Sequence, residues 1–253
     1  MAAPEYLETV QGRRLAYRYT DGAGPTVVFL GGLKSDMAGT KAVHLEAWCA
    51  AQGRAFLRFD YSGHGESSGT FEEGCIGDWA EDTGEVLTKL TRGALIVVGS
   101  SMGGWQALLF ARANPDRVAG LVTIAAAPDF TEDGYAASFS ADQMAALERD
   151  GFVEMPSDYM EPYIITRRLI EDGRRQLVLR DPLALPFPVR CLQGTADTAV
   201  STRTAVRLLD HAESPDMRLL LVKDADHRFS DGPCLGLIED AISDVLAAAR
   251  QGG

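Results

Sequence analysis

The chain has 253 residues and carries 36 Asp and Glu against 24 Lys and Arg, which gives a formal net charge of −12. A chain of this length can form one α/β domain with a sizeable buried core. Nucleic acids are bound by clusters of Lys and Arg, and the sequence has no such cluster, so its composition argues against a nucleic-acid partner.

Apolar runs and turn residues predict strands that alternate with helices along most of the chain. A strand pair is predicted over Thr9–Tyr19, with its turn at Gln11 and Gly12. The strands predicted after it are Thr26–Leu30, Arg54–Asp60, Ala94–Val98, Val118–Ala125, Val189–Gln193 and Met217–Val222. The predicted helices are Thr40–Gln52, Ile76–Leu90, Gly104–Ala113 and Leu235–Arg250. This alternation predicts an α/β fold with a mostly parallel central sheet and helices on both faces.

The segment from Pro128 to Pro188 breaks the alternation because it shows no strand pattern. Ser140-Ala141-Asp142-Gln143 is typical of a capping box that opens a helix, and a second helix is predicted over Tyr159–Glu171. Because ~60 residues exceed the usual connection between elements, we interpret the segment as a helical cap insertion rather than a long crossover. The predicted organisation is a core of residues 1–127 and 189–253 with a cap of residues 128–188.

A Gly-x-Ser-x-Gly motif with Ser101 at its centre joins the strand Ala94–Val98 to the helix Gly104–Ala113. In a strand–turn–helix unit, this motif raises the serine hydroxyl above the sheet, and the glycines let strand and helix approach closely. The helix N-terminus adds free N–H groups and a positive dipole. The alternative is a glycine-rich turn with an incidental serine, which this context disfavours. We therefore predict Ser101 as a nucleophile.

A serine nucleophile needs a general base, and His227 is the histidine that follows the last predicted strand. Strand–turn–helix serine hydrolases place the nucleophile, the acid and the histidine in that order along the chain. Asp197 follows the strand Val189–Gln193 and the turn at Gly194, so it is the predicted acid that orients the imidazole. Three other carboxylates stay open as alternatives: Asp129, Asp224 and Asp226.

An oxyanion intermediate needs two N–H donors. The residue after the nucleophile, Met102, supplies one, and the loop Gly31-Gly32-Leu33 after the strand Thr26–Leu30 supplies the other, with Leu33 as the predicted donor. Trp105, one turn further along the helix, is a candidate for lining the substrate pocket. Packing of the helix against the sheet explains Trp105 equally well.

With these residues in place, the chain resembles the α/β-hydrolase superfamily from about Thr26 to the C-terminus. Within it, the chain is similar to the group of mitochondrial palmitoyl-protein thioesterases and acyl-glucuronide esterases. The matching stretches are Gly39-Thr40-Lys41-Ala42, Arg58-Phe59-Asp60-Tyr61-Ser62-Gly63, Val98-Gly99-Ser100-Ser101-Met102-Gly103-Gly104-Trp105 and Asp226-His227-Arg228. Many members have His-Gly where this chain has Gly31-Gly32. The resemblance implies cleavage of an ester or thioester bond in a small-molecule or acylated substrate.

The predicted reaction is acyl hydrolysis through an acyl-enzyme, which needs no cofactor and no metal. Two alternatives stay open: a C–C bond hydrolase that uses the same three residues, and a non-catalytic binding protein on the same scaffold. The first residues of the chain show neither a secretory signal nor an Arg-rich transit sequence, and no apolar run is long enough to span a membrane. We therefore expect a cytoplasmic protein without stable membrane insertion. The sequence leaves the oligomeric state open.

Overall fold

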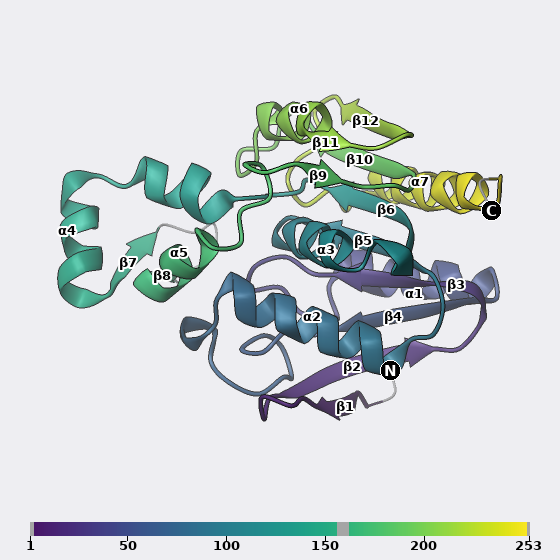
Figure 1. Ribbon diagram of the computed structural model, residues 1–253, viewed down its shortest axis with the longest axis horizontal. Helices are drawn as coiled ribbons and strands as arrows, with labels where there is room; N and C mark the ends of the chain where they lie inside the picture. The colour runs from purple at the N-terminus through teal and green to yellow at the C-terminus, as the bar shows by residue number, and fades with distance from the viewer. Residues whose placement is uncertain (1–2, 156–161, 252–253) are drawn as a thin grey trace.

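The structure is a computed structural model that describes residues 3–155 and 162–251. Among these residues, the strands of the main sheet are β1 (Glu5–Glu8), β2 (Arg14–Thr20), β3 (Ala23–Leu30), β4 (Arg54–Phe59), β5 (Leu95–Ser100), β6 (Val118–Ile124), β10 (Val189–Gly194) and β12 (Met217–Val222). They lie in the order β1-β2-β4-β3-β5-β6-β10-β12 (Figure 1). The pairs β1–β2 and β2–β4 are antiparallel, and the other neighbours are parallel. The predicted mostly parallel sheet is confirmed.

Helices cover both faces of this sheet (Figure 1). They are α1 (Thr40–Ala51), α2 (Ile76–Leu90), α3 (Met102–Ala113), α6 (Thr202–His211) and α7 (Gly232–Gln251), with short 3₁₀ turns η1 (Phe71–Glu73) and η2 (Pro115–Arg117). One apolar cluster joins the sheet to α1 and α7, and a second joins it to α2 and α3. The central strands are therefore buried on both faces of the sheet, which explains why each of them is a continuous apolar run in the sequence.

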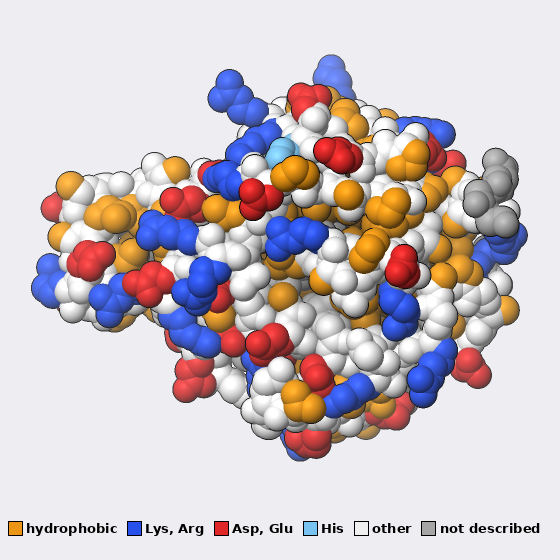
Figure 2. Space-filling model, viewed as in Figure 1, with side chains coloured by type: hydrophobic (Ala, Val, Ile, Leu, Met, Phe, Trp, Pro, Cys, Tyr) orange, Lys and Arg blue, Asp and Glu red, His pale blue; other side chains and the backbone are white. Residues whose placement is uncertain are grey.

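Charged side chains of both signs are interspersed over the surface. On the face shown in Figure 2, Lys and Arg lie among Asp and Glu, and the basic side chains do not gather into one patch.

All four cysteines of the chain are buried and free of disulfides: Cys49, Cys75, Cys191 and Cys234. No helix in the described ranges combines the length and apolar composition needed to cross a membrane.

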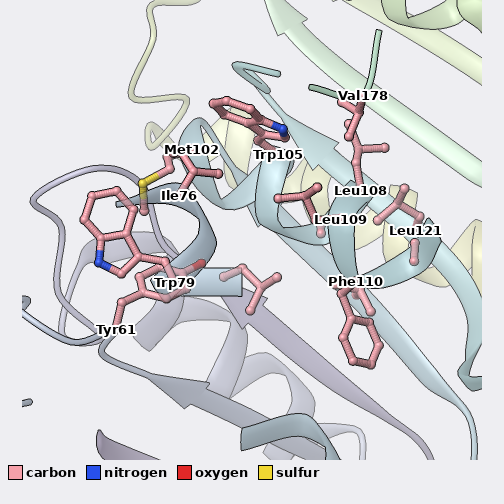
Figure 3. Packing of buried hydrophobic residues seen from close by; sticks show 14 of the residues in the cluster. Tyr61, Ile76, Trp79, Met102, Trp105, Leu108, Leu109, Phe110, Leu121 and Val178 are labelled. Carbon is pink, nitrogen blue, oxygen red and sulfur yellow. The ribbon is translucent and has the colours of Figure 1, made fainter. Parts of the chain in front are cut away.

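The helix α3 lies in the centre of the apolar cluster that it shares with α2. The side chain of Met102 lies beside Ile76 and the ring of Trp79, while Leu108 and Leu109 pack further along the helix (Figure 3). All of these side chains are almost completely buried. The start of α3, at the carboxyl end of β5, is therefore held firmly by the core.

Between β6 and β10 the chain leaves the sheet. This segment contains a π-helical turn η3 (Thr131–Ala136), α4 (Ala141–Asp150), β7 (Phe152–Met155), β8 (Tyr163–Thr166), α5 (Arg167–Gly173) and β9 (Leu183–Ala184), which pairs with β11 (Ala212–Glu213). The elements α4, β7, β8 and α5 extend away from the main sheet (Figure 1). The predicted capping box is confirmed, since the Ser140 and Gln143 side chains each accept from the other's backbone N–H.

The secondary structure predicted for this segment was partly wrong. It contains strands, because β7 and β8 pair antiparallel between Phe152–Met155 and Tyr163–Thr166. The helix predicted over Tyr159–Glu171 starts later, as α5, and its first residues, 159–161, lie outside the described part of the chain. Tyr-Ile-Ile-Thr is rich in aromatic and β-branched residues, which favour strands, and Thr166 caps α5 by accepting from the Leu169 N–H. Pairing across a hairpin is not visible in a single strand's sequence.

Candidate active site

Ser101 has a strained backbone conformation between β5 and α3. Its φ of 55° and ψ of −120° lie in a region that residues with a Cβ seldom adopt. A Cβ on Gly99 would overlap the carbonyl of Gly103, and a Cβ on Gly103 would overlap the carbonyl of Leu30. The two glycines are therefore required by the close approach of helix and strand. The Ser101 N–H donates to the Ile124 carbonyl at 2.9 Å, which ties the turn to the neighbouring strand β6.

His227 lies in the loop between β12 and α7, and its imidazole bridges two of the predicted residues. Nε2 lies 3.1 Å from the Ser101 hydroxyl oxygen, and Nδ1 lies 2.8 Å from Asp197 Oδ2. Both distances are within hydrogen-bond reach. Residues that are 96 and 30 positions apart along the chain (197 − 101 and 227 − 197) thus meet at the carboxyl ends of β5, β10 and β12.

The carboxylate of Asp197 is fully buried and held by four donors. The N–H groups of Ala199 and Val200 donate to Oδ1, each at 2.8 Å, and the Gln193 side-chain amide donates to Oδ2 at 2.9 Å. Burial works to raise the pKa of Asp197, but the hydrogen bonds from His227, Val200 and Gln193 and the charge of His227 outweigh it, so the pKa lies below its usual value. The group therefore stays an anion that can accept a hydrogen bond from the Nδ1–H of the imidazole.

Two of the alternative acids, Asp129 and Asp226, have other partners. Asp129 is fully buried after β6, where its carboxylate accepts from the N–H groups of Val178 and Leu179 and pairs with Arg180 at 3.0 Å. Burial outweighs these partners and raises the pKa of Asp129. Asp226 accepts from the Phe229 N–H at 3.1 Å within the loop of His227. The imidazole itself contacts Asp197.

The other histidines are engaged elsewhere. His44 Nε2 lies 2.6 Å from a carboxylate oxygen of Glu239, and His211 Nε2 lies 2.8 Å from the Asp181 carbonyl. His64 is buried, with its ring edge-on to Trp79 at 5.1 Å. These partners are consistent with structural roles.

The comparisons with known proteins show the family to which this chain belongs. Residues 25–150 match the family described as alpha/beta hydrolase fold. A curated bovine relative, palmitoyl-protein thioesterase ABHD10, mitochondrial, is 35% identical over 237 residues, which cover 92% of this chain and 76% of that protein. The chain belongs to the α/β-hydrolase family.

Solved structures show the same relationship for this α/β hydrolase. A putative hydrolase from Agrobacterium vitis S4 is 38% identical with a TM-score of 0.91, and the match covers 96% of this chain and 98% of that one. The mouse alpha/beta hydrolase domain-containing protein 10 is 32% identical with a TM-score of 0.90, covering 97% and 99% of the two chains. Both matches extend across the segment between β6 and β10.

The expected cytoplasmic location is wrong. The curated bovine, rat, mouse and human relatives all carry the word mitochondrial in their names. The prediction depended only on the first few residues of the chain. A targeting signal in the first residues indicates a location, but the lack of a recognisable signal there gives no information on location.

The two predicted oxyanion donors, Met102 and Leu33, belong to the two segments that meet at Ser101 in this α/β hydrolase. Met102 is the first residue of α3, where an N–H has no partner within the helix, and its side chain is anchored against Trp79 (Figure 3). Leu33 follows Gly32, where a Cβ would lie only 3.3 Å from the Ser101 Cβ. Within the described ranges, the structure shows no hydrogen-bond partner for either N–H.

Trp105 is fully buried and faces the segment between β6 and β10. Its indole N–H donates to the Gln176 carbonyl at 3.0 Å, and its ring is edge-on to Phe130 at 5.5 Å. Because the ring is fully buried and its N–H has a partner, packing accounts for this side chain.

Two residues near this site were missed in the sequence. Gln193 is a polar residue in a buried strand, and its amide donates to Asp197 and to the Val200 carbonyl. A buried amide within an apolar strand is a signal that was available. Lys41 lies in the motif Gly39-Thr40-Lys41-Ala42, but its partner is a loop 187 residues away, so no local pattern predicts the contact.

Proposed function

We propose that this α/β hydrolase cleaves carboxylic esters or thioesters through an acyl-enzyme, with Ser101 as nucleophile, His227 as general base and Asp197 as the acid that orients it. The observation that carries the proposal is the bridging imidazole, which lies 3.1 Å from the Ser101 hydroxyl and 2.8 Å from the Asp197 carboxylate. These contacts also favour catalysis over a binding role, since a binding protein has no need of an aligned serine and base.

In the acylation step, Nε2 of His227 takes the hydroxyl proton as Ser101 Oγ forms a bond to the acyl carbon. The carbonyl oxygen becomes an oxyanion, which accepts hydrogen bonds from the N–H groups of Met102 and Leu33. The imidazolium is stabilised by the Asp197 carboxylate. When the tetrahedral intermediate collapses, His227 returns the proton to the departing alcohol or thiol.

Deacylation repeats these steps with water in place of the serine. His227 removes a proton from water, the new oxygen attacks the acyl carbon, and Ser101 leaves with its proton restored by the imidazolium. Every proton moves between Ser101, His227 and the reactants, so the cycle needs no group from outside the chain and water.

The substrate that the comparisons favour is an acyl thioester, because the curated relatives are named palmitoyl-protein thioesterases. We place the choice of acyl group in residues 128–188, which we propose act as a cap on a core of residues 1–127 and 189–253. In this segment, Phe130 and Gln176 contact Trp105 of the helix that follows Ser101, so the position of the segment is coupled to that of the nucleophile.

The test is labelling by a fluorophosphonate, followed by intact-mass measurement and hydrolysis of p-nitrophenyl esters and acyl thioesters. We expect one adduct on Ser101 and loss of hydrolysis in Ser101→Ala. Ser100→Ala is the matched control, because Ser100 is a buried strand residue next to the nucleophile and its loss should leave labelling intact. Undiminished hydrolysis by folded Ser101→Ala would refute the proposal.

A further inference from the structure

The loop that carries His227 is held by the neighbouring strand and by the core, since Ala225 and Phe229 are buried in the apolar cluster of α1 and α7. The Asp224 N–H donates to Thr195 Oγ1 at 2.9 Å, and the Ala196 N–H donates to the Ala225 carbonyl at 3.0 Å. Asp224 and Phe229 both have positive φ, at 60° and 49°. A non-glycine residue at positive φ is strained, so a loop with two of them needs its conformation enforced by contacts.

A polar contact also joins this loop to α1. Lys41, in the first turn of α1, donates its ammonium to the carbonyl of Arg228, the residue directly after His227. The same ammonium lies 3.4 Å from Ser230 Oγ, and Ser230 donates in turn to the Arg228 carbonyl at 2.8 Å. The carbonyl of Arg228 therefore has two donors, one from its own loop and one from α1.

A lysine in this position is electrostatically unfavourable for the fold. It lies at the N-terminus of a helix of 12 residues that has no acidic residue in its first turn, so the helix dipole opposes its charge. Burial lowers the pKa of Lys41 to about 8, since the attraction of Asp226 and of the Cys234 sulfur only partly offsets burial and the repulsion of Arg228. The charge is therefore retained at a cost to stability, which is expected of a residue with a role in function.

We propose that Lys41 is a positioning residue that ties the loop of His227 to α1 and so keeps the imidazole between Ser101 and Asp197. This inference rests on the catalytic roles proposed above. Because α1 directly follows the loop that carries Leu33, the same contact also fixes the base relative to the proposed oxyanion donor. Lys41 acts through the backbone of Arg228 and does not itself touch the reacting atoms.

The contact gives the reaction a dependence on pH in the alkaline range. Below pH about 8 Lys41 is an ammonium and makes a charge-assisted hydrogen bond, which is stronger and shorter than a neutral one. As the pH rises through this value the ammonium loses a proton, and the neutral amine holds the carbonyl less firmly. A misplacement of the base affects the transition state more than substrate binding, so kcat should fall while KM stays constant.

The experiment compares the wild type with Lys41→Met and Lys41→Arg, using kcat and KM for a p-nitrophenyl ester from pH 6 to pH 10, after correction for spontaneous hydrolysis. We expect a wild-type decline in kcat centred near pH 8. Lys41→Met should lower kcat at pH 7 by roughly tenfold or more, leave KM unchanged and remove the decline. Lys41→Arg keeps a permanent charge, so its decline should vanish or move upward. Lys89→Met, which removes an exposed lysine paired with Glu85, is the matched control.

The outcomes separate this inference from the proposed function. If hydrolysis survives in Ser101→Ala, the proposed function fails whatever Lys41 does. If Ser101 is essential but Lys41→Met and Lys41→Arg both keep the wild-type kcat and its pH profile, the positioning role is refuted. Should Lys41→Met fail to fold, the profile of Lys41→Arg decides, because retention of the wild-type decline would show that another group titrates.

Discussion

The strained backbone of Ser101 leads to a stability prediction that is independent of any substrate. At φ 55° and ψ −120°, a residue with a Cβ carries about 1–3 kcal/mol of strain, and glycine carries little of it. Glycine also makes the unfolded chain more flexible, which lowers the stability of the folded state by about 0.5–1 kcal/mol. The Ser101→Gly variant should therefore be more stable than Ser101→Ala by about 1 kcal/mol.

The comparison between the two variants removes the other effects. Both lose the hydroxyl that lies 3.1 Å from His227, and both lack the nucleophile, so only the Cβ differs. The free energy of unfolding is measured by urea denaturation, after a check that the two variants have the same dependence of free energy on urea concentration. In thermal unfolding, a difference of about 1 kcal/mol corresponds to roughly 2–4 °C in Tm at this chain length. If Ser101→Ala proves equal to or more stable than Ser101→Gly, the turn is not strained and the reasoning is wrong.

Three further predictions follow from the contacts around the site. In Asp197→Asn, the N–H groups of Ala199 and Val200 hold the amide oxygen at the Oδ1 position, so the NH₂ group lies toward His227 and forces the wrong imidazole tautomer. Steady-state kinetics should show kcat reduced about 10⁴-fold. Thermal unfolding should show a loss of stability as well, because the NH₂ group would also face the Gln193 amide donor. Gly103→Ala places a methyl group against the carbonyl of the last residue of β3 and should destabilise the fold by about 1–3 kcal/mol. Gly84→Ala in α2 is the control, because a Cβ there meets open space and should be neutral or stabilising by up to about 1 kcal/mol. Equal urea midpoints for the two variants would contradict the close approach of α3 to β3. Because folding lowers the pKa of Lys41 to about 8, the unfolded chain binds more protons than the folded chain between about pH 8 and 10.5. The unfolding free energy of the wild type relative to that of Lys41→Met should therefore rise by about 1 kcal/mol from pH 7 to 9. A parallel pH dependence in the two proteins would argue against the lowered pKa of Lys41.

The fold was predictable because its signals are local. Buried parallel strands such as Ile96–Val98 are continuous apolar runs, and α2 begins at Ile76 and ends at Leu90 as its helical spacing indicates. Ser140 and Gln143 fix the start of α4 by contacts within one turn. The hairpin of β7 and β8 was missed because each strand is four residues long and depends on its partner.

The chemical pattern of the site was also present in the sequence, since Gly-x-Ser-x-Gly between a strand and a helix requires a tight turn whatever the rest of the chain does. The choice among carboxylates required the tertiary structure, because Asp129 and Asp197 both follow parallel strands and both are buried. Only the fold shows that Asp129 is held by residues 178–180 while Asp197 reaches the imidazole. Local patterns determine which turns and helices form. The contact between Lys41 and the carbonyl beside His227 depends on how distant elements pack, and no short stretch of sequence encodes it.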